Sequence, residues 1–550
     1  MIERRIGLRK GASNACRFFC FAAGIAIINK MMKVRKFRRY LFRESSYILR
    51  VRSTVLHPIR GVELLVEKGA KKAINLGRLY QGPFQIEQDD GWYTIFTTTP
   101  SNKPVRNPGL GLIAYAWEEN GPSIQARQGQ ETIEEHVEKL AKLPYVDILY
   151  IRCDWRDVQS SPGQLDLHPI WEATFAAAER YGLRVAFRIQ LSSPNIQPAK
   201  LAMPDFLHDQ VPLVNIGRFH NHDFDYYEPR YDHPAFQAAF TELNELLAER
   251  FDGNPIIEFV DLMMYGFWGE GHTNDLQNPF PDYTTAEHTF MSMTRQQIER
   301  WKYTPLAVNT QPDISHTGNR TVREYAMNED CWVRTDSIIL DEPEQIEVIS
   351  GRATWTAAVI EDGYYRHFKQ EKLKFDSGNV DVIANSMLHA LDIGGNYWGL
   401  WTEAEAIASY HELYPEGIDT LQRRLGYRLR PSWVWQRKRL GTDELVIALS
   451  NDGVSGVPGT LWLEAVNADG SEKVRGKLDK GCPLPSKVSL ASMILPASWR
   501  NQEIRLSIEL EVRPGQYKQV NWACAQKVNE DGSLSIQLKA HEDTDWRCGV

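Results

Sequence analysis

Cysteine is scarce in this sequence, with seven residues in 550, and no two of them show the CxxC or CxxH spacing that zinc ligands usually share. The odd number leaves at least one thiol unpaired, so a disulfide framework is not indicated. We expect buried or free thiols, and a bridge between Cys482 and Cys524 is the alternative left open. The cysteines are Cys16, Cys20, Cys153, Cys331, Cys482, Cys524 and Cys548.

Long apolar runs are also missing. One stretch stands out, from about Ala15 to Ile28, but it falls short of the roughly 20 residues that a bilayer requires, and Arg17 interrupts it. Its charged start, with Arg4 and Arg5, resembles a secretory signal, although no clear A-x-A cleavage site follows. We therefore expect no stable membrane span. Residues 1–60 are a signal-like or disordered basic leader, and both an exported (periplasmic or extracellular) and a cytoplasmic location stay open.

Positive charge is sparse beyond this leader. Residues 1–60 hold 15 Lys and Arg against 2 Asp and Glu, so with a net charge of -8 overall the remaining chain carries -21. An acidic surface repels a phosphate backbone, which argues against nucleic acid as a partner. With 43% hydrophobic residues and 16 Trp, the chain can bury one large core and a second, smaller one.

From about residue 107, strand-like and helix-like segments alternate, which is the pattern of βα units around a parallel sheet. Eight units can be counted, and they predict an α/β fold with a closed (β/α)8 TIM barrel over residues 107–425. The predicted strands cover 109–117, 146–155, 183–192, 256–270, 304–311, 331–338, 354–361 and 396–401. Apolar residues that recur every three or four positions predict helices, which include 131–143, 167–182, 234–252, 286–302 and 379–394.

After Gly426 the pattern changes to short alternating runs, such as ELVIALSND and EIRLSIELEV, divided by Gly, Asp and Asn turns. These runs predict a C-terminal all-β sandwich over residues 426–550. Nothing in it concentrates acid or base residues, so we expect an accessory role. The segment 61–106 is expected to pack on the barrel as strands and loop.

In such a barrel the chemistry lies at the carboxyl ends of the strands, where the βα loops converge. The stretch VDLMMYGFWGEGHT (260–273) has this form, because an apolar run is followed by glycines that let the backbone turn beside Glu270. Besides the catalytic candidates, we expect the following residues at this edge to bind substrate: Trp117, Asp154, Trp155, Gln190, Trp268, His272, Asn309, Gln311, Arg334, Asp336, Trp398, Trp401 and Glu403.

Two glutamates, Glu270 and Glu361, end the fourth and seventh predicted strands and so face each other across the barrel mouth. Retaining hydrolysis of a glycosidic bond needs such a pair about 5–5.5 Å apart, one ionised to attack the anomeric carbon and one protonated to release the leaving oxygen. Glu270, beside Trp268, is predicted to be the acid, because desolvation raises a carboxyl pKa. Glu361 is predicted to be the nucleophile, with Arg334 or Tyr364 stabilising its anion.

The stretch YIRCDWRDVQSSPGQLDLHPIWEATFAAAERYGLRVAFRIQ (150–190) resembles the second and third βα units of clan GH-A glycoside hydrolases, particularly family 42 β-galactosidases. The likeness extends over roughly residues 107–425. It implies a TIM-barrel glycosidase in which Glu270 is the acid/base and Glu361 the nucleophile. It also implies an aromatic residue under the reacting sugar, matched here by Trp401 or Trp398.

One position departs from that family pattern. Clan members usually have Asn immediately before the acid/base glutamate, where it binds the sugar 2-hydroxyl, and this chain has Gly269. Asn309, Gln190 or His272 could make that contact instead. Together with NPGLG (107–111) and LGYRLRPSWVWQ (425–436), Gly269 indicates a divergent branch that combines the barrel with a β-sandwich.

The candidates also have structural interpretations. A carboxylate after a strand can cap the next helix, as Glu403 could, and Asp154 and Asp336 could pair with Arg152 and Arg334. The pattern as a whole favours a retaining glycoside hydrolase for a β-linked carbohydrate, with no cofactor and no metal. The alternative is a catalytically inactive carbohydrate-binding barrel. A metal-dependent barrel hydrolase would need a His/Asp cluster at one point of the rim, which the predicted strand ends lack.

Overall fold

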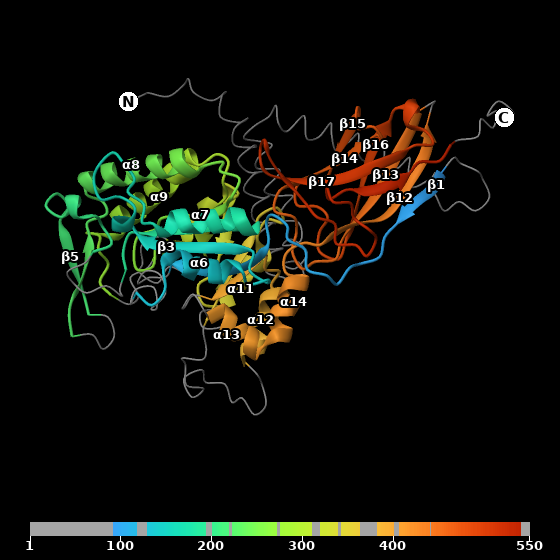
Figure 1. Ribbon diagram of the computed structural model, residues 1–550. Helices are drawn as coiled ribbons and strands as arrows, with labels where there is room; N and C mark the ends of the chain where they lie inside the picture. Colours follow the sequence, from blue (N-terminus) through green and yellow to red (C-terminus); the bar gives the residue numbers. More distant parts are fainter. Residues whose placement is uncertain are drawn as a thin grey trace, which may run out of the picture. The chain divides into compact units, whose positions relative to one another are not determined.

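The computed structural model describes residues 92–117, 129–193, 201–218, 223–271, 276–310, 319–338, 343–363, 382–400, 406–439 and 442–540 (Figure 1). Eight of its strands close a parallel barrel in the order β10-β11-β2-β3-β4-β7-β8-β9, so the predicted barrel and its eight strands are confirmed. The barrel strands are β2 (Gly111–Trp117), β3 (Ile148–Asp154), β4 (Arg184–Gln190), β7 (Ile257–Asp261), β8 (Leu306–Asn309), β9 (Trp332–Arg334), β10 (Ala358–Asp362) and β11 (Tyr397–Leu400).

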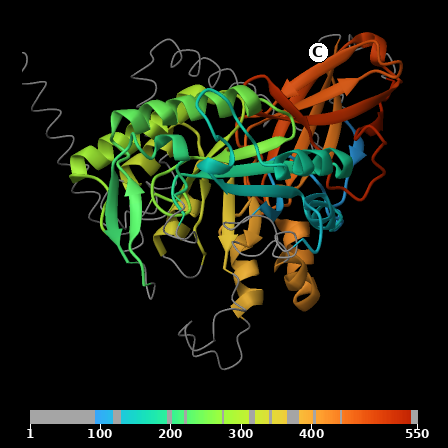
Figure 2. The same cartoon turned by 60° about the vertical axis from the view of Figure 1, so that its left-hand side comes forward.

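Helices lie along the outside of the barrel, and α8 and α9 run side by side in both views (Figures 1 and 2). Local signals set their ends: Thr132 and Glu135 form a capping box at the start of α6, and Gly182 ends α7 with a φ of +63°. The helices are α6 (Ile133–Ala141), α7 (Ile170–Tyr181), α8 (Pro234–Phe251), α9 (Tyr283–Arg300), α10 (Asn319–Asn328), α11 (Pro343–Gly351), α12 (Val382–Asp392), α13 (Ala406–Leu413) and α14 (Pro415–Arg424).

Alternate residues of each barrel strand face opposite ways. Ile113 and Tyr115 of β2 belong to a small apolar cluster filling the barrel interior, whereas Leu112 and Ala114 belong to the large cluster between strands and helices. Tyr150 of β3 faces the interior as well. This alternation brings Tyr115 and Tyr150 to the same side as the strand-end carboxylates.

The predicted fourth strand is too long at its carboxyl end. It was expected to run from 256 to 270, but β7 stops at Asp261. Gly266, Gly269 and Gly271 all have positive φ angles, and Trp268 has a φ of +58°, so residues 265–271 cannot continue an extended strand. Glu270 therefore lies in a loop beyond the strand, and Asp261 is the residue at the strand end.

Two separate antiparallel sheets follow the barrel. Side chains from both sheets share a second apolar cluster, in agreement with the predicted all-β region, and no described residue after 424 lies in an α-helix. One sheet has the order β1-β12-β13-β16, and the other has the order β15-β14-β17-β18 with β19 paired to β17. The strands are β1 (Trp92–Thr97), β12 (Leu429–Arg439), β13 (Thr442–Asn451), β14 (Thr460–Val466), β15 (Lys473–Lys477), β16 (Val488–Leu495), β17 (Glu503–Arg513), β18 (Gln516–Gln519) and β19 (Leu534–Gln537).

Residues 92–106 of the N-terminal segment are described, and the four described cysteines are free thiols, as expected. Residues 61–106 were expected to pack on the barrel, but β1 pairs with β12 in an antiparallel sheet, while Arg106 of the same segment does reach Asp147 of the barrel. The alternative bridge between Cys482 and Cys524 is not formed, because both are free thiols. None of the helices in the described ranges has both the length and the apolar character of a membrane crossing. Residues 1–91, including the basic leader, lie outside the description.

Candidate active site

Glu361 lies in β10 near its carboxyl end, where a cation and a hydroxyl bind its carboxylate. Arg334, the last residue of β9, donates to Oε2 of Glu361, and the Tyr115 hydroxyl donates to the same oxygen at 3.2 Å. Thr335 Oγ1 accepts from the Glu361 backbone N–H at 2.7 Å, which fixes the neighbouring strand ends. The predicted pairing of Glu361 with Arg334 is confirmed. Tyr364, the other predicted partner, lies outside the described residues.

Glu270 is held by the loop that follows β7. Arg188 of β4 donates from Nη1 to Glu270 Oε1 at 2.9 Å and to the Trp268 carbonyl at 2.7 Å. The loop also closes on itself, because the Glu270 amide donates to the Phe267 carbonyl at 3.2 Å. One arginine thus fixes both the carboxylate and the backbone before it.

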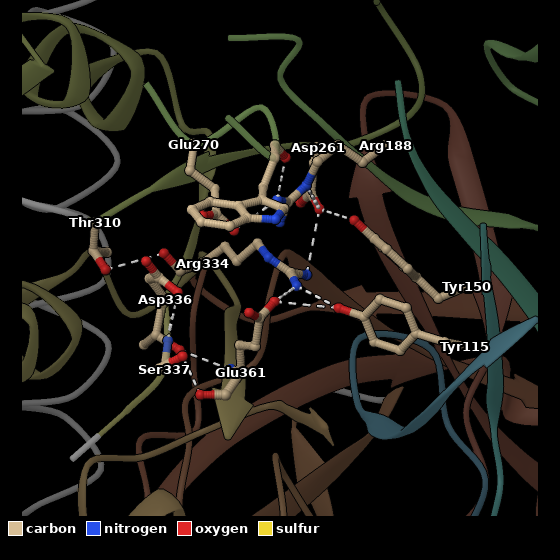
Figure 3. A network of polar contacts seen from close by, with 12 residues as sticks. Tyr115, Tyr150, Arg188, Asp261, Glu270, Thr310, Arg334, Asp336, Ser337 and Glu361 are labelled. Atoms are coloured by element: carbon tan, nitrogen blue, oxygen red, sulfur yellow. Dashed lines mark hydrogen bonds and ion pairs between the residues drawn. The ribbon is translucent and has the colours of Figure 1, made fainter. Parts of the chain in front are cut away.

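Asp261 joins the two halves of this network (Figure 3). Its Oδ2 accepts from Arg188 Nε at 3.2 Å, lies 3.3 Å from Arg334 Nη1, and accepts a hydrogen bond from the Tyr150 hydroxyl. The Arg334 guanidinium also lies over the Tyr150 ring, 5.2 Å from its centroid. Asp261 thereby orients one arginine toward each glutamate.

Burial and charge act in opposite directions on the two arginines. Burial alone lowers the pKa of Arg188, but Tyr150, Asp261 and Glu270 outweigh it and hold the pKa well above its usual value. The pKa of Arg334 is likewise raised, since Tyr115, Tyr150 and Asp261 overcome burial and the repulsion from Arg188. Both guanidinium groups are therefore permanent cations inside the barrel mouth.

The two glutamates and Asp336 place their carboxylates together. One oxygen of each lies within 4.8 Å of one oxygen of the other two. Glu270 and Glu361 are each only 3% exposed, whereas Asp336 and Trp268 are partly exposed, so solvent reaches the group from the side of Asp336 and Trp268. Asp336 is positioned by the Ser337 amide, which donates to its Oδ1 at 2.8 Å.

The sequence predicted no His/Asp cluster at one point of the rim, but Asp336 joins the two glutamates in a group of three carboxylates. Three carboxylates at this spacing have the chemistry to bind a cation. Two of them, however, already face guanidinium groups, since Arg188 contacts Glu270 and Arg334 contacts Glu361. The positive charge that a metal would supply is therefore provided by the protein for these two.

Other candidates are either near the ends of barrel strands or outside the described ranges. Gln190 and Asp154 lie side by side at the ends of β4 and β3, with Gln190 Nε2 donating to Asp154 Oδ1 at 3.1 Å. Asn309 is buried at the end of β8. Four predicted residues lie outside the described ranges: His272, Gln311, Trp401 and Glu403.

The described candidate tryptophans differ in how deeply they are buried. Trp117, Trp155 and Trp398 are buried in the large apolar cluster between strands and helices. Trp155 donates to Gln159 at 2.8 Å and Trp398 donates to Asp362 at 3.1 Å, so their polar atoms are used within the protein. All three were expected to bind substrate, and the structure instead places them in the core. Trp268 alone among the described candidates is a partly exposed indole beside the glutamates.

Sequence reasoning missed Asp261, Tyr115 and Tyr150 as members of the site. Asp261 was hidden because the fourth strand was expected to continue to Glu270. The two tyrosines sit inside apolar strands, where they look like core residues. A usable signal was their position, because Tyr115 and Tyr150 have the strand parity that faces the barrel interior.

Comparison with known proteins gives structural matches only. No family model matches the chain, and no curated protein matches it. The β-amylase catalytic domain from Paenibacillus polymyxa is 10% identical, with 56% of this chain and 98% of that chain covered and a TM-score of 0.36. Endo-glycoceramidase II from Rhodococcus sp. is 13% identical, with 72% and 100% covered and a TM-score of 0.34.

A GH42 β-galactosidase from G. stearothermophilus, of the family that the sequence resembles, is also matched. It is 13% identical, with 55% of this chain and 52% of that chain covered and a TM-score of 0.35. These likenesses concern the fold, and one barrel supports many unrelated reactions. Function must therefore be argued from the site itself.

Proposed function

We propose that the protein is a retaining glycoside hydrolase that acts on a β-linked carbohydrate, with Glu361 as the nucleophile and Glu270 as the acid/base. The observation that carries the proposal is the approach of their carboxylate oxygens to within 4.8 Å. A retaining pair is separated by about 5–5.5 Å, whereas an inverting pair is separated by about 6.5–9.5 Å to admit a water. The short spacing supports direct attack on the sugar.

The hydrogen-bond donors support this division of roles. Oε2 of Glu361 receives both the Arg334 guanidinium and the Tyr115 hydroxyl, and both favour its ionised form. Glu270 receives Arg188, which it shares with Asp261, just as Glu361 shares Arg334 with Asp261. Repulsion among the three clustered carboxylates favours protonation of one of them, and we assign the proton to Glu270 because Oε2 of Glu361 accepts from two donors. Glu361 is thus the better anion and Glu270 the better proton donor.

The reaction then proceeds in two displacements. A Glu361 oxygen attacks the anomeric carbon while Glu270 gives its proton to the departing glycosidic oxygen, so the carbon–oxygen bond to the leaving group breaks as the ester to Glu361 forms. In the second step Glu270 takes a proton from water, the water oxygen attacks the same carbon, and Glu361 is released. The two inversions together retain the β configuration.

Substrate contacts are proposed where polar or aromatic groups face the pair. Trp268 can stack on the apolar face of a sugar ring, and Asp336 can accept a sugar hydroxyl. Within the described residues Gln190 Oε1 is buried and accepts no hydrogen bond, so it is a candidate acceptor for a hydroxyl near the 2-position. An Asn in place of Gly269 would be strained, because Gly269 has a φ of +72° and an added Cβ would lie 3.3 Å from Arg188 Cδ.

Two other functions compete with this one. A catalytically inactive carbohydrate-binding barrel would keep the contacts and lack turnover. A metal-dependent hydrolase is favoured by one observation, the three gathered carboxylates. The arginines opposing two of them favour the metal-free reaction, so we expect EDTA to leave the rate unchanged.

The deciding experiment measures turnover of a panel of nitrophenyl β-glycosides and polysaccharides by the wild type, Glu270→Ala and Glu361→Ala. For an active substrate we expect Glu361→Ala to lose all measurable activity and Glu270→Ala to lose roughly 10²–10⁴-fold. Added azide should give an α-glycosyl azide with Glu361→Ala and a β-glycosyl azide with Glu270→Ala. The configuration of each product identifies which carboxylate is missing.

Glu172→Ala is the matched control, since Glu172 is an exposed glutamate of α7. It should keep full activity. Undiminished turnover in either site variant would remove that glutamate from its role. Loss of wild-type activity in EDTA, restored by a divalent cation, would establish the metal-dependent alternative. Binding of sugar without turnover of any substrate would establish the inactive one.

A further inference from the structure

A buried carboxyl group, Glu228, lies beneath the loop that carries Glu270. It belongs to β6 (Tyr226–Pro229), which pairs with β5 (Leu213–Gly217) in a hairpin between β4 and α8. Glu228 is completely buried, and two hydroxyl groups donate to its two oxygens: Ser192 to Oε1 and Tyr231 to Oε2. A charged group rarely occupies such a position without a specific purpose.

Tyr231 and Ser192 both contact the loop that carries Glu270, at two adjacent residues. The Tyr231 hydroxyl accepts from the Gly266 amide at 3.3 Å, and Ser192 forms a parallel β-bridge with Phe267. The Phe267 carbonyl in turn accepts from the Glu270 amide at 3.2 Å. Glu228 therefore reaches the backbone of Glu270 by two short routes that meet at residues 266 and 267.

We propose that Glu228 is a positioning residue that holds the Glu270 loop through Tyr231 and Ser192 and makes the loop's order depend on the protonation of Glu228. This rests on the proposed function, in which Glu270 is the acid/base. Glu228 reaches the backbone of that loop through the Tyr231 hydroxyl and the strand bridge of Ser192.

The hydrogen-bond geometry explains the direction of the effect. When Glu228 is ionised, Ser192 and Tyr231 each donate to one oxygen, and the polarised Tyr231 oxygen accepts strongly from Gly266. When Glu228 is protonated, its own hydrogen must go to one of these hydroxyls, which then loses its acceptor. The ionised form thus holds the loop more firmly than the neutral form.

The surroundings place this change near neutral pH. Burial raises the pKa of Glu228 to about 7, against the lowering effect of the hydrogen bonds from Ser192 and Tyr231. No ion pair to Glu228 occurs among the described residues. The nearby charges are paired with one another: Arg230 with Asp232 at 2.7 Å beside Tyr231, and Arg218 with Asp225 at 3.0 Å in the hairpin. The Tyr265 ring faces the Tyr231 ring from the loop, at 6.0 Å.

The test measures hydrogen exchange of the peptide spanning residues 262–271 between pH 5.5 and 8.5, corrected for intrinsic exchange, in the full chain without substrate. In the wild type we expect protection to rise roughly three- to tenfold with a midpoint near pH 7. Glu228→Gln should abolish this rise, because the amide does not titrate. Tyr231→Phe should weaken it, because one route to the loop is cut.

The variant Ser192→Ala distinguishes a change in the pKa of Glu228 from a general loss of loop structure. Removing a hydrogen bond that lowers the pKa should move the midpoint to higher pH while the rise remains. Glu245→Gln, the same chemical change at an exposed site of α8, should behave as the wild type. A wild-type pH response in Glu228→Gln, or an unmoved midpoint in Ser192→Ala, would overturn the proposal.

The exchange measurement needs no catalysis, so it stands even if the proposed hydrolysis fails. Where activity is found, the pH profile of kcat/KM gives a second readout. Glu228→Gln should lose one ionisation from that profile, and a uniform fall in rate at every pH would show a merely structural role.

Discussion

At the scale of single residues, Asp261 links the two buried arginines of the site. Its Oδ2 lies against Arg188 and Arg334, and each arginine then reaches a different glutamate. Two buried arginines thus contact three buried carboxyl groups, and their charges balance when Glu270 is protonated. Removing one member leaves another buried charge without a partner, which is more costly than the pair is worth when intact.

Arg334→Met tests this compensation. The substitution keeps the apolar stem but removes the charge facing Glu361 and Asp261, so we expect the free energy of unfolding to fall by about 3–5 kcal/mol. Urea denaturation at neutral pH measures the change. The matched control is Arg320→Met, whose guanidinium is exposed and pairs with Glu344 at 3.0 Å. That variant should stay within about 0.5 kcal/mol of the wild type, and equal losses in the two variants would contradict the argument.

At the scale of elements, the segment from Asp261 to Gly271 decides where Glu270 lies. The segment cannot remain extended to Glu270, since Gly266, Gly269 and Gly271 all have positive φ. Gly271 is more confined than Gly269. An added Cβ would lie 2.9 Å from Met264 Cε and 3.1 Å from Asn319 Nδ2.

Gly271→Ala is therefore expected to disturb the site more than the backbone angle alone predicts. The angle costs roughly 1–2 kcal/mol in any alanine variant of this kind, and overpacking adds about 1–3 kcal/mol. Gly182→Ala is the control, because Gly182 has a similar φ of +63° and nothing within 4 Å of its added Cβ. Thermal unfolding should show a larger loss for Gly271→Ala. A smaller loss than in Gly182→Ala would show that the loop has room to adjust.

Elements also show what the sequence could predict. The eight barrel strands follow from alternation of apolar runs and amphipathic helices, and all eight occur near their expected positions. The end of the fourth strand could not be predicted, because an apolar run such as LMMYGF suits a strand and a buried loop equally. Its true end at Asp261 depends on positive φ angles that only the folded loop requires.

The site residues also divide into those that the sequence could predict and those that it could not. The approach of Glu270 to Glu361, and the pairing of Glu361 with Arg334, could be predicted, since strand ends and the loops that follow them converge in any such barrel. The contacts of Asp261 with Tyr150 and Arg188 could not, because three strands must first be placed side by side in register. The direction of Trp398 also depends on the register of its strand. Tyr397 of β11 belongs to the cluster inside the barrel, so its neighbour Trp398 faces the helices.

At the scale of the whole described molecule, buried polar contacts join the barrel to the antiparallel sheets. Glu258 of β7 receives Arg184 at 2.9 Å, the Tyr397 hydroxyl at 2.6 Å and Lys518 of β18 at 3.1 Å. Arg352 similarly donates to Ser455 at 2.9 Å from the barrel side. The barrel and the sheets are therefore expected to lose stability together when such a contact is removed.

Lowering the pH should weaken the coupling between the barrel and the sheets, because it protonates Glu258. Burial opposes ionisation of Glu258, but Arg184, Lys518, Tyr397 and the Gly109 amide outweigh it and lower the pKa to about 2. Since the folded pKa lies below the unfolded value of 4.5, the ionised group stabilises the protein above pH 4.5, and this stabilisation is lost as the pH falls from 4.5 toward 2. The difference corresponds to about 3 kcal/mol.

Glu258→Gln should remove that part of the acid sensitivity. We expect the variant to be less stable than the wild type at pH 7, and the gap between the two to narrow as the pH falls to 2.5, in urea denaturation followed by tryptophan fluorescence. Lys518→Met should produce part of the same effect from the side of the sheets. Glu299→Gln, at an exposed position of α9, should reproduce the wild-type curve. A gap between wild type and Glu258→Gln that stays constant from pH 7 to 2.5 would mean that the contact stabilises the fold by packing, and that its charge contributes nothing to the joining of barrel and sheets.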